Sequence, residues 1–112
     1  MDTTTRPTMT ETALARANVE TINDETMINV LRERARHAYP DERAHREGLT
    51  TTYIYADGPD MVAGVVPGTY VLEETEHGQT ACYRFTDRYD AYDVVVARSL
   101  DAQLDDARAA RA

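Results

Sequence analysis

A shortage of large apolar side chains constrains this fold more than any other feature of the sequence. Val, Leu, Ile and Phe together supply only 19 of 112 residues, while the formal net charge is −8. That combination lies near the composition at which disorder becomes the default expectation. Ala, Met and seven Tyr must therefore supply much of the packing. A partner subunit, another binding partner or high salt is expected to help order so thin a core.

The charged residues are unusual in kind as well as in balance. All twelve basic residues are Arg, with no Lys, against twenty Asp and Glu. An acidic surface of this kind suits a saline cytoplasm, because self-repulsion is screened over about 3 Å in 1 M salt. The composition resembles that of proteins from salt-loving archaea or their viruses. A GC-rich genome, whose codons favour Arg and Ala over Lys, is the alternative explanation.

The sequence predicts a cytoplasmic protein with no membrane partner. Cys82 is the single cysteine, so no internal disulfide can form. The first twelve residues lack the charged-then-apolar pattern of a signal peptide, and no apolar run approaches the length of a membrane span. A virus-particle component would show the same features.

The N-terminal part has the periodicity of helices. Thr8 and Glu11 have the spacing of a capping box, in which each side chain satisfies a free backbone N–H of the other residue. The helix that follows is expected to reach about Ile22. A second helix is expected to begin after a cap at Thr21 to Asp24, because apolar residues then recur at three- and four-residue steps. Pro40 is expected to stop it.

The middle of the chain changes to strand-like sequence. A short turn of helix over 41–47 is expected first, after which runs rich in Thr, Tyr and Val alternate with turn residues. Short turns between consecutive strands favour an antiparallel meander. The four predicted strands cover residues 50–56, 61–66, 70–76 and 79–86.

The last two predicted strands suggest a definite register. His77 and Gly78 suit a two-residue hairpin loop, which would place Leu72 opposite Tyr83. Cys82 would then lie on the outer face as a small, semi-buried hydrophobe. The face expected to be buried holds Tyr70, Leu72, Tyr83 and Phe85.

The C-terminal segment is expected to form one long helix over 88–110. Acidic residues crowd its start and Arg residues lie at its end, which suits the helix dipole. A strand at 91–97 followed by a shorter helix is the alternative. The sequence thus predicts a flexible N-terminus over 1–7 and a single α+β domain over 8–112. That domain would have N-terminal helices, a four-stranded antiparallel β-meander and a C-terminal helix.

Residues that could carry chemistry are sparse. The sequence contains no G-x-G-x-x-G, H-E-x-x-H, G-x-S-x-G or C-x-x-C motif, and without Lys it has no P-loop. His37, His45 and His77 are expected to be surface residues, because a metal site needs three or four convergent ligands. No catalytic residue, metal or cofactor is therefore expected, and the sequence favours a non-enzymatic protein. A small enzyme whose site forms only between subunits is the weakest hypothesis.

One basic segment, residues 24–48, suggests nucleic-acid binding. Five Arg lie between residues 32 and 46, and that stretch is locally positive although the whole chain is acidic. Helices followed by a hairpin also resemble the outline of a winged helix, and no family motif accompanies that outline. The alternative is a solvated face whose Arg residues pair with nearby acids. The candidate nucleic-acid contacts are Arg32, Arg36, Arg43 and Arg46.

The leading hypothesis is a small non-enzymatic interaction protein: an adaptor, a regulator or a virion component. Tyr is abundant, and it is enriched at protein interfaces because it buries area and keeps a polar tip. The C-terminal apolar stripe is expected to cover the sheet with its first part and to reach a second copy with its far end, which gives at least a homodimer. The candidate interface residues are Tyr92, Val96, Leu100, Leu104 and Ala107.

Folding is expected to depend on salt. The acidic excess costs self-repulsion at low ionic strength, and a thin core has little margin to absorb that cost. Thermal unfolding in about 0.1 M and about 2 M KCl should show a higher midpoint at the higher salt. An unchanged midpoint would contradict the halophile interpretation.

Overall fold

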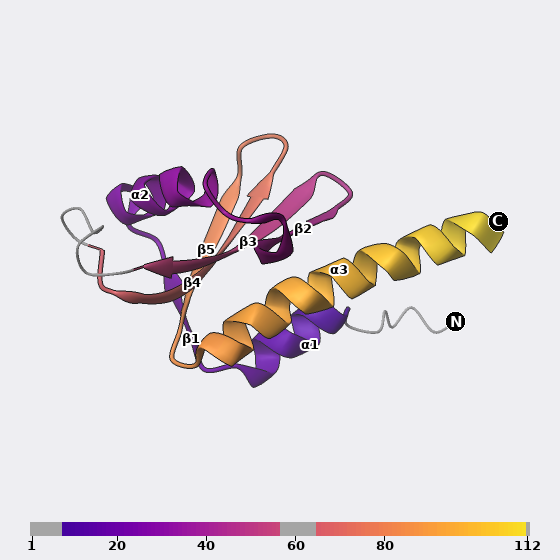
Figure 1. Ribbon diagram of the computed structural model, residues 1–112, viewed down its shortest axis with the longest axis horizontal. Helices are drawn as coiled ribbons and strands as arrows, with labels where there is room; N and C mark the ends of the chain where they lie inside the picture. Colours follow the sequence, from indigo (N-terminus) through magenta and orange to yellow (C-terminus); the bar gives the residue numbers. More distant parts are fainter. Residues whose placement is uncertain (1–7, 57–64, 112) are drawn as a thin grey trace, which may run out of the picture.

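The computed structural model describes residues 8–56 and 65–111, which form an α+β fold. A five-stranded antiparallel sheet in the order β1-β5-β4-β3-β2 lies between α2 on one face and the α1/α3 pair on the other (Figure 1). The helical elements are α1 (Met9–Arg16), α2 (Glu25–Ala35), the 3₁₀ turn η1 (Pro40–Glu42) and α3 (Arg88–Arg111). The strands are β1 (Val19–Ile22), β2 (Arg43–Arg46), β3 (Leu49–Ala56), β4 (Gly68–Thr75) and β5 (Thr80–Phe85).

The capping box predicted at the N-terminus is present, but the helix that it starts is shorter than predicted. α1 ends at Arg16, because the backbone becomes extended at Ala17 and the chain leaves the helix. The next residues form β1 and pair with β5, so that Val19 lies opposite Phe85. Pairing with a neighbouring strand thus overrides a spacing that was compatible with a helix. α2 then begins at the cap Asp24, whose carboxylate accepts from two backbone N–H groups.

The helical turn predicted over 41–47 is wrong for most of its length. Only η1 is helical, and the chain continues as β2, which pairs with β3 in a hairpin. The two loop residues, Glu47 and Gly48, have φ values of 41° and 77°. Positive φ at both central residues is the signature of a type I′ turn, which matches the twist of two antiparallel strands.

The sheet has five strands where the sequence predicted four. The antiparallel arrangement is confirmed, as are strands close to 50–56, 70–76 and 79–86. The predicted strand over 61–66 lies mostly outside the described residues, and its last two residues are not in a strand. β3 pairs directly with β4 along its whole length, so no strand separates them. The long C-terminal helix is confirmed, and the alternative strand over 91–97 is wrong.

The predicted register of the β4–β5 hairpin is wrong by one residue. Its loop has three residues, because Gly78 N–H donates to the Thr75 carbonyl at 3.0 Å and Gly78 has φ 85°. A turn followed by a residue in the left-handed region is the usual three-residue hairpin loop. Leu72 therefore lies opposite Cys82, and Val71 lies opposite Tyr83.

The shifted register places Cys82 in the core. Its side chain is fully buried, and burial raises the pKa of the thiol to about 12. The thiol is therefore protonated at neutral pH and acts as a small hydrophobe. The prediction of a semi-buried cysteine on an outer face was therefore wrong.

Both faces of the sheet are covered, and this explains the register error. Three successive residues of β4, Tyr70, Val71 and Leu72, have no exposed surface. Alternation cannot identify an outer face in such a strand, because neither face is solvated. The α2-side core includes Leu31, Ile54, Tyr70, Leu72 and Cys82. The α3-side core includes Val71, Phe85, Ala91 and Val94.

A buried ion pair joins α3 to the middle of the sheet. Arg98 Nη2 donates to Glu73 Oε2 at 2.7 Å, and Thr51 Oγ1 donates to the same oxygen at 3.0 Å. Arg98 Nε also donates to Thr51 Oγ1 at 3.3 Å. Glu73 and Arg98 are only 8% and 9% exposed. Each charge therefore depends on the other, because an unpaired charge at this depth would be costly.

Removing one partner of this pair should destabilise the fold more than removing both. Glu73→Ala leaves Arg98 buried without its carboxylate and is expected to cost about 3–5 kcal/mol. The double variant Glu73→Leu with Arg98→Met replaces the pair by apolar groups and should recover most of that loss. Urea unfolding at high salt measures both. A double variant as unstable as the single one would contradict this account.

Candidate functional site

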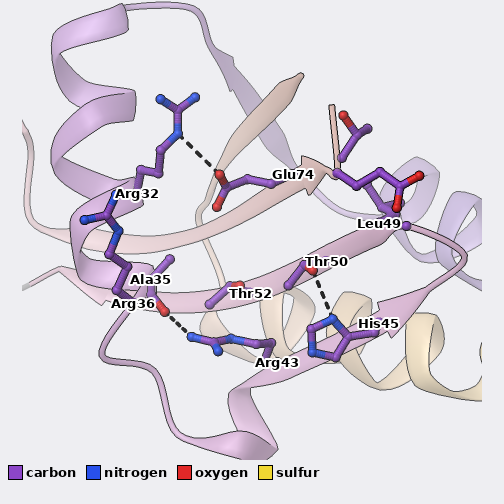
Figure 2. A pocket seen from close by; sticks show the side chains of 12 residues that line it. Arg32, Ala35, Arg36, Arg43, His45, Leu49, Thr50, Thr52 and Glu74 are labelled. Carbon is purple, nitrogen blue, oxygen red and sulfur yellow. Dashed lines mark hydrogen bonds and ion pairs between the residues drawn. The ribbon is translucent and has the colours of Figure 1, made fainter. Parts of the chain in front are cut away.

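A groove lined by charged and apolar side chains lies between α2 and the ends of β2, β3 and β4. Its volume is about 530 Å³. Figure 2 shows Arg32 and Arg36 projecting from α2, with Arg43 and His45 approaching from β2. The acids Glu74 and Glu76 also line it, so the groove carries both signs of charge.

The cations of this groove are engaged within the chain. Arg32 donates to Asn29 at 3.1 Å and to Thr80 at 2.6 Å, and its Nε lies 3.3 Å from Glu74. Arg36 pairs with Glu33 at 3.0 Å. Arg43 donates to the carbonyl of Ala35, where α2 ends, and His45 Nδ1 lies 3.0 Å from Thr50 Oγ1. These contacts favour the interpretation in which the arginines pair locally.

Arg46 lies on the other face of the sheet. Successive residues of a strand point to opposite faces, so Arg46 faces α3 while Arg43 and His45 face α2. Its guanidinium binds Asp105 through two bonds, of 2.5 Å and 3.0 Å. The hydrogen bond raises the pKa of Arg46 and lowers that of Asp105. The four predicted nucleic-acid contacts therefore do not form one surface.

α3 turns the predicted interface stripe away from the sheet. The residues of α3 that are buried are Ala91, Val94, Val95, Ala97, Arg98 and Asp101. The stripe on the opposite side is 38–46% exposed at Tyr92, Val96, Leu100 and Leu104, and it ends at exposed Ala107. These five residues are called the α3 stripe below.

The expectation that the first part of the α3 stripe covers the sheet holds only for Tyr92. Only Tyr92 has a described contact with the sheet, an edge-to-face contact with Tyr53 at a centroid distance of 5.8 Å. Helical spacing identifies a stripe but does not say which stripe faces inward. Here Ala91 and Val94 let the helix approach the sheet closely, and they are fully buried.

α1 extends this apolar surface beyond α3. The two helices lie side by side under the sheet (Figure 1), and a groove of about 360 Å³ runs between them. Met9 and Ala13 line one side of the groove, and Val96 and Leu100 line the other. Met9 is 44% exposed. The α3 stripe together with Met9 is called the α1/α3 surface below.

Asp101 fixes α1 against α3. Its carboxylate accepts from Met9 N–H and Thr10 N–H, both at 3.0 Å, and from Thr10 Oγ1 at 2.7 Å. Burial raises the pKa of Asp101, but the hydrogen bonds from Thr10 and Met9 outweigh that effect and hold it below its usual value. The first backbone N–H groups of α1 are thus capped by another helix, a contact that sequence spacing could not reveal.

The described residues provide little for other chemistry. They contain no group of three or more metal-ligating side chains in reach of a common ion. None of their helices is both long and apolar enough to cross a membrane. No protein-family model, curated protein or solved structure matches the chain.

Replacing Asp101 by Asn should weaken the attachment of α1 and change how the free energy of unfolding depends on pH in acid. Because its pKa is lowered on folding, the ionised carboxylate contributes stability above about pH 4, and this is lost as pH falls through the lower folded value. Asp101→Asn is expected to cost about 1–2 kcal/mol at pH 7. The difference from the unaltered chain should shrink below about pH 4.

Asp106→Asn is the matched control, because Asp106 is an exposed acid of the same helix. It should change the free energy of unfolding by less than about 0.5 kcal/mol. Urea unfolding between about pH 3 and pH 7 measures both variants. Equal losses for the two variants would contradict the capping role.

Proposed function

We propose that this protein is a small, non-enzymatic interaction protein that docks a protein partner on its α1/α3 surface. The observation that supports this is an apolar stripe about four turns long that the described residues leave largely exposed. Val96, Leu100 and Leu104 each leave more than a third of their surface exposed. Contiguous apolar patches that remain on a folded surface are typical of protein interaction sites.

α3, the helix that carries the stripe, is fixed by contacts on its side that faces the sheet and α1. Arg98 bonds to β4, Asp101 caps α1 and Asp105 binds β2. All three anchors point away from the stripe. A docking surface fixed in this way loses little conformational freedom on binding, which favours affinity.

The arginine groove gives weaker support to the alternative, a nucleic-acid-binding regulator that uses residues 24–48. Its cations contact groups of the same chain, and Glu74 and Glu76 lie among them. A phosphate backbone would have to displace those contacts and approach those acids. A protein that docks on the α1/α3 surface would not have to displace contacts of this kind, and that surface is therefore the preferred site.

The same proposal includes self-association and a saline environment. A chain with so few large apolar residues gains stability if a second subunit buries the α3 stripe. The acidic net charge would oppose association at low salt and oppose it less in a saline cytoplasm or a virus particle.

Site-specific photo-crosslinking in the native host tests the docking surface. A photoreactive residue in place of Leu100 is expected to capture protein, whereas one in place of Thr26 is not. Thr26 is an exposed residue of α2 and lies across the sheet from α3. Adding Leu104→Asp should reduce the Leu100 adduct about tenfold or more, since it places a charge in the interface. Equal adducts at Leu100 and Thr26, or no adduct at either, would overturn the proposal.

A further inference from the structure

The α3 stripe is close to symmetric about Leu100. Val96 and Leu104 lie four residues before and after it, on the same exposed side of the helix. In an antiparallel pair of such helices centred on Leu100, Leu100 meets its own copy and Val96 meets Leu104. A self-complementary surface of this kind suits a two-fold axis, because each contact then occurs twice.

The charges beside the stripe favour the antiparallel direction. Asp93 is exposed and borders the groove between α1 and α3, while Arg108 is exposed near the other end of the helix. The antiparallel register places Arg108 of the second copy beside Asp93 and Tyr92, where it can form an ion pair and a cation–π contact. A parallel pair would place Asp93 beside Asp93 and would also align the two helix dipoles.

The far end of α3 extends past the other described elements (Figure 1). Residues 106–110 are exposed, and the helix continues beyond the sheet (Figure 1). Short helical segments without tertiary contacts are marginal in water. A second helix alongside would cover Leu104 and Ala107, and the small side chains of Ala107 and Ala110 would allow close approach.

These observations identify the occupant of the α1/α3 surface. Resting on the proposed function, we infer that the partner is a second copy of this chain, with the two α3 helices packed antiparallel about a two-fold axis at Leu100. Each copy buries the other's stripe, and Arg108 of one copy pairs with Asp93 of the other. The result is a symmetric dimer in which both sheets lie outside a central layer of helices.

Disulfide crosslinking between single cysteines introduced on α3 tests this antiparallel arrangement directly. Cys82 is buried with a pKa of about 12, so an introduced thiol is the only reactive one in the described part of the chain. Helix axes about 8–10 Å apart leave facing Cα atoms roughly 4–5 Å apart, within reach of a disulfide. Residues four positions from the axis lie about 12 Å from their own copies along the helix, beyond that reach.

Leu100→Cys is therefore expected to form a covalent dimer under mild oxidation. Val96→Cys and Leu104→Cys should each stay uncrosslinked alone, but should crosslink to each other when the two are mixed. Ser99→Cys is the matched control, because Ser99 is exposed and adjacent to Leu100 but lies off the stripe. Circular dichroism before oxidation verifies that each variant is folded.

A crosslink of Val96→Cys alone as efficient as that of Leu100→Cys would indicate parallel packing and overturn the inference. So would equal crosslinking of Ser99→Cys, which would indicate random collision. In multi-angle light scattering at high salt, the unaltered chain should run at twice 12.6 kDa. Asp93→Arg should weaken the dimer about threefold to tenfold, and adding Arg108→Asp should restore it.

The two proposals can fail separately. A monomer near 12.6 kDa in light scattering overturns self-pairing. If the Leu100 photo-adduct then contains a different protein, the docking function stands with another partner. If neither self-pairing nor a Leu100 adduct is found, both proposals are wrong.

Discussion

The ion pair between Arg98 and Glu73 is the contact on which the arrangement of this molecule depends. It is buried between α3 and the central strand β4, where apolar residues would be expected. Val94 and Ala91 alone could pack against the sheet in more than one register, because apolar contacts are not directional. A charged pair with a third partner in Thr51 has one good geometry. The pair therefore fixes how α3 is rotated, a role in specificity that buried ion pairs can have without adding net stability.

That rotation determines which face of α3 meets water. Arg98, Asp101 and Asp105 are three charged residues on the inner side, and each is satisfied by a different element. The larger apolar residues Leu100 and Leu104 are consequently left outside. Three inward-facing charged residues and two exposed leucines depart from the usual pattern of a surface helix, although Ala91 and Val94 also face inward. The inward-facing polar groups of this helix are paired within the fold, and the association proposed above would cover its apolar side.

The sequence predicted the class of the fold and the long C-terminal helix, because these follow from periodicity and capping. It missed β1 and β2, whose residues become strands only through their pairing with β5 and β3. It also misjudged the hairpin register, since β4 is buried on both faces and Glu73 is hidden by a partner 25 residues away. The apolar stripe of α3 was identified from spacing alone, and its role as an interface stays a prediction. The outward orientation of the stripe was not identified, because orientation depends on contacts between elements distant in sequence.

The thin core and the exposed stripe are both related to the small number of large apolar side chains. A chain with 19 large apolar residues cannot cover both faces of a five-stranded sheet and also keep every apolar residue inside. Here the core on the two faces of the sheet is built partly from Ala91, Cys82 and paired polar groups such as Thr51. This leaves several of the larger side chains free for the surface. Apolar area that the isolated fold leaves exposed adds stability only where another molecule covers it. The proposed assembly would therefore couple folding to association, and stability would then depend on concentration and on the salt that screens the acidic surface.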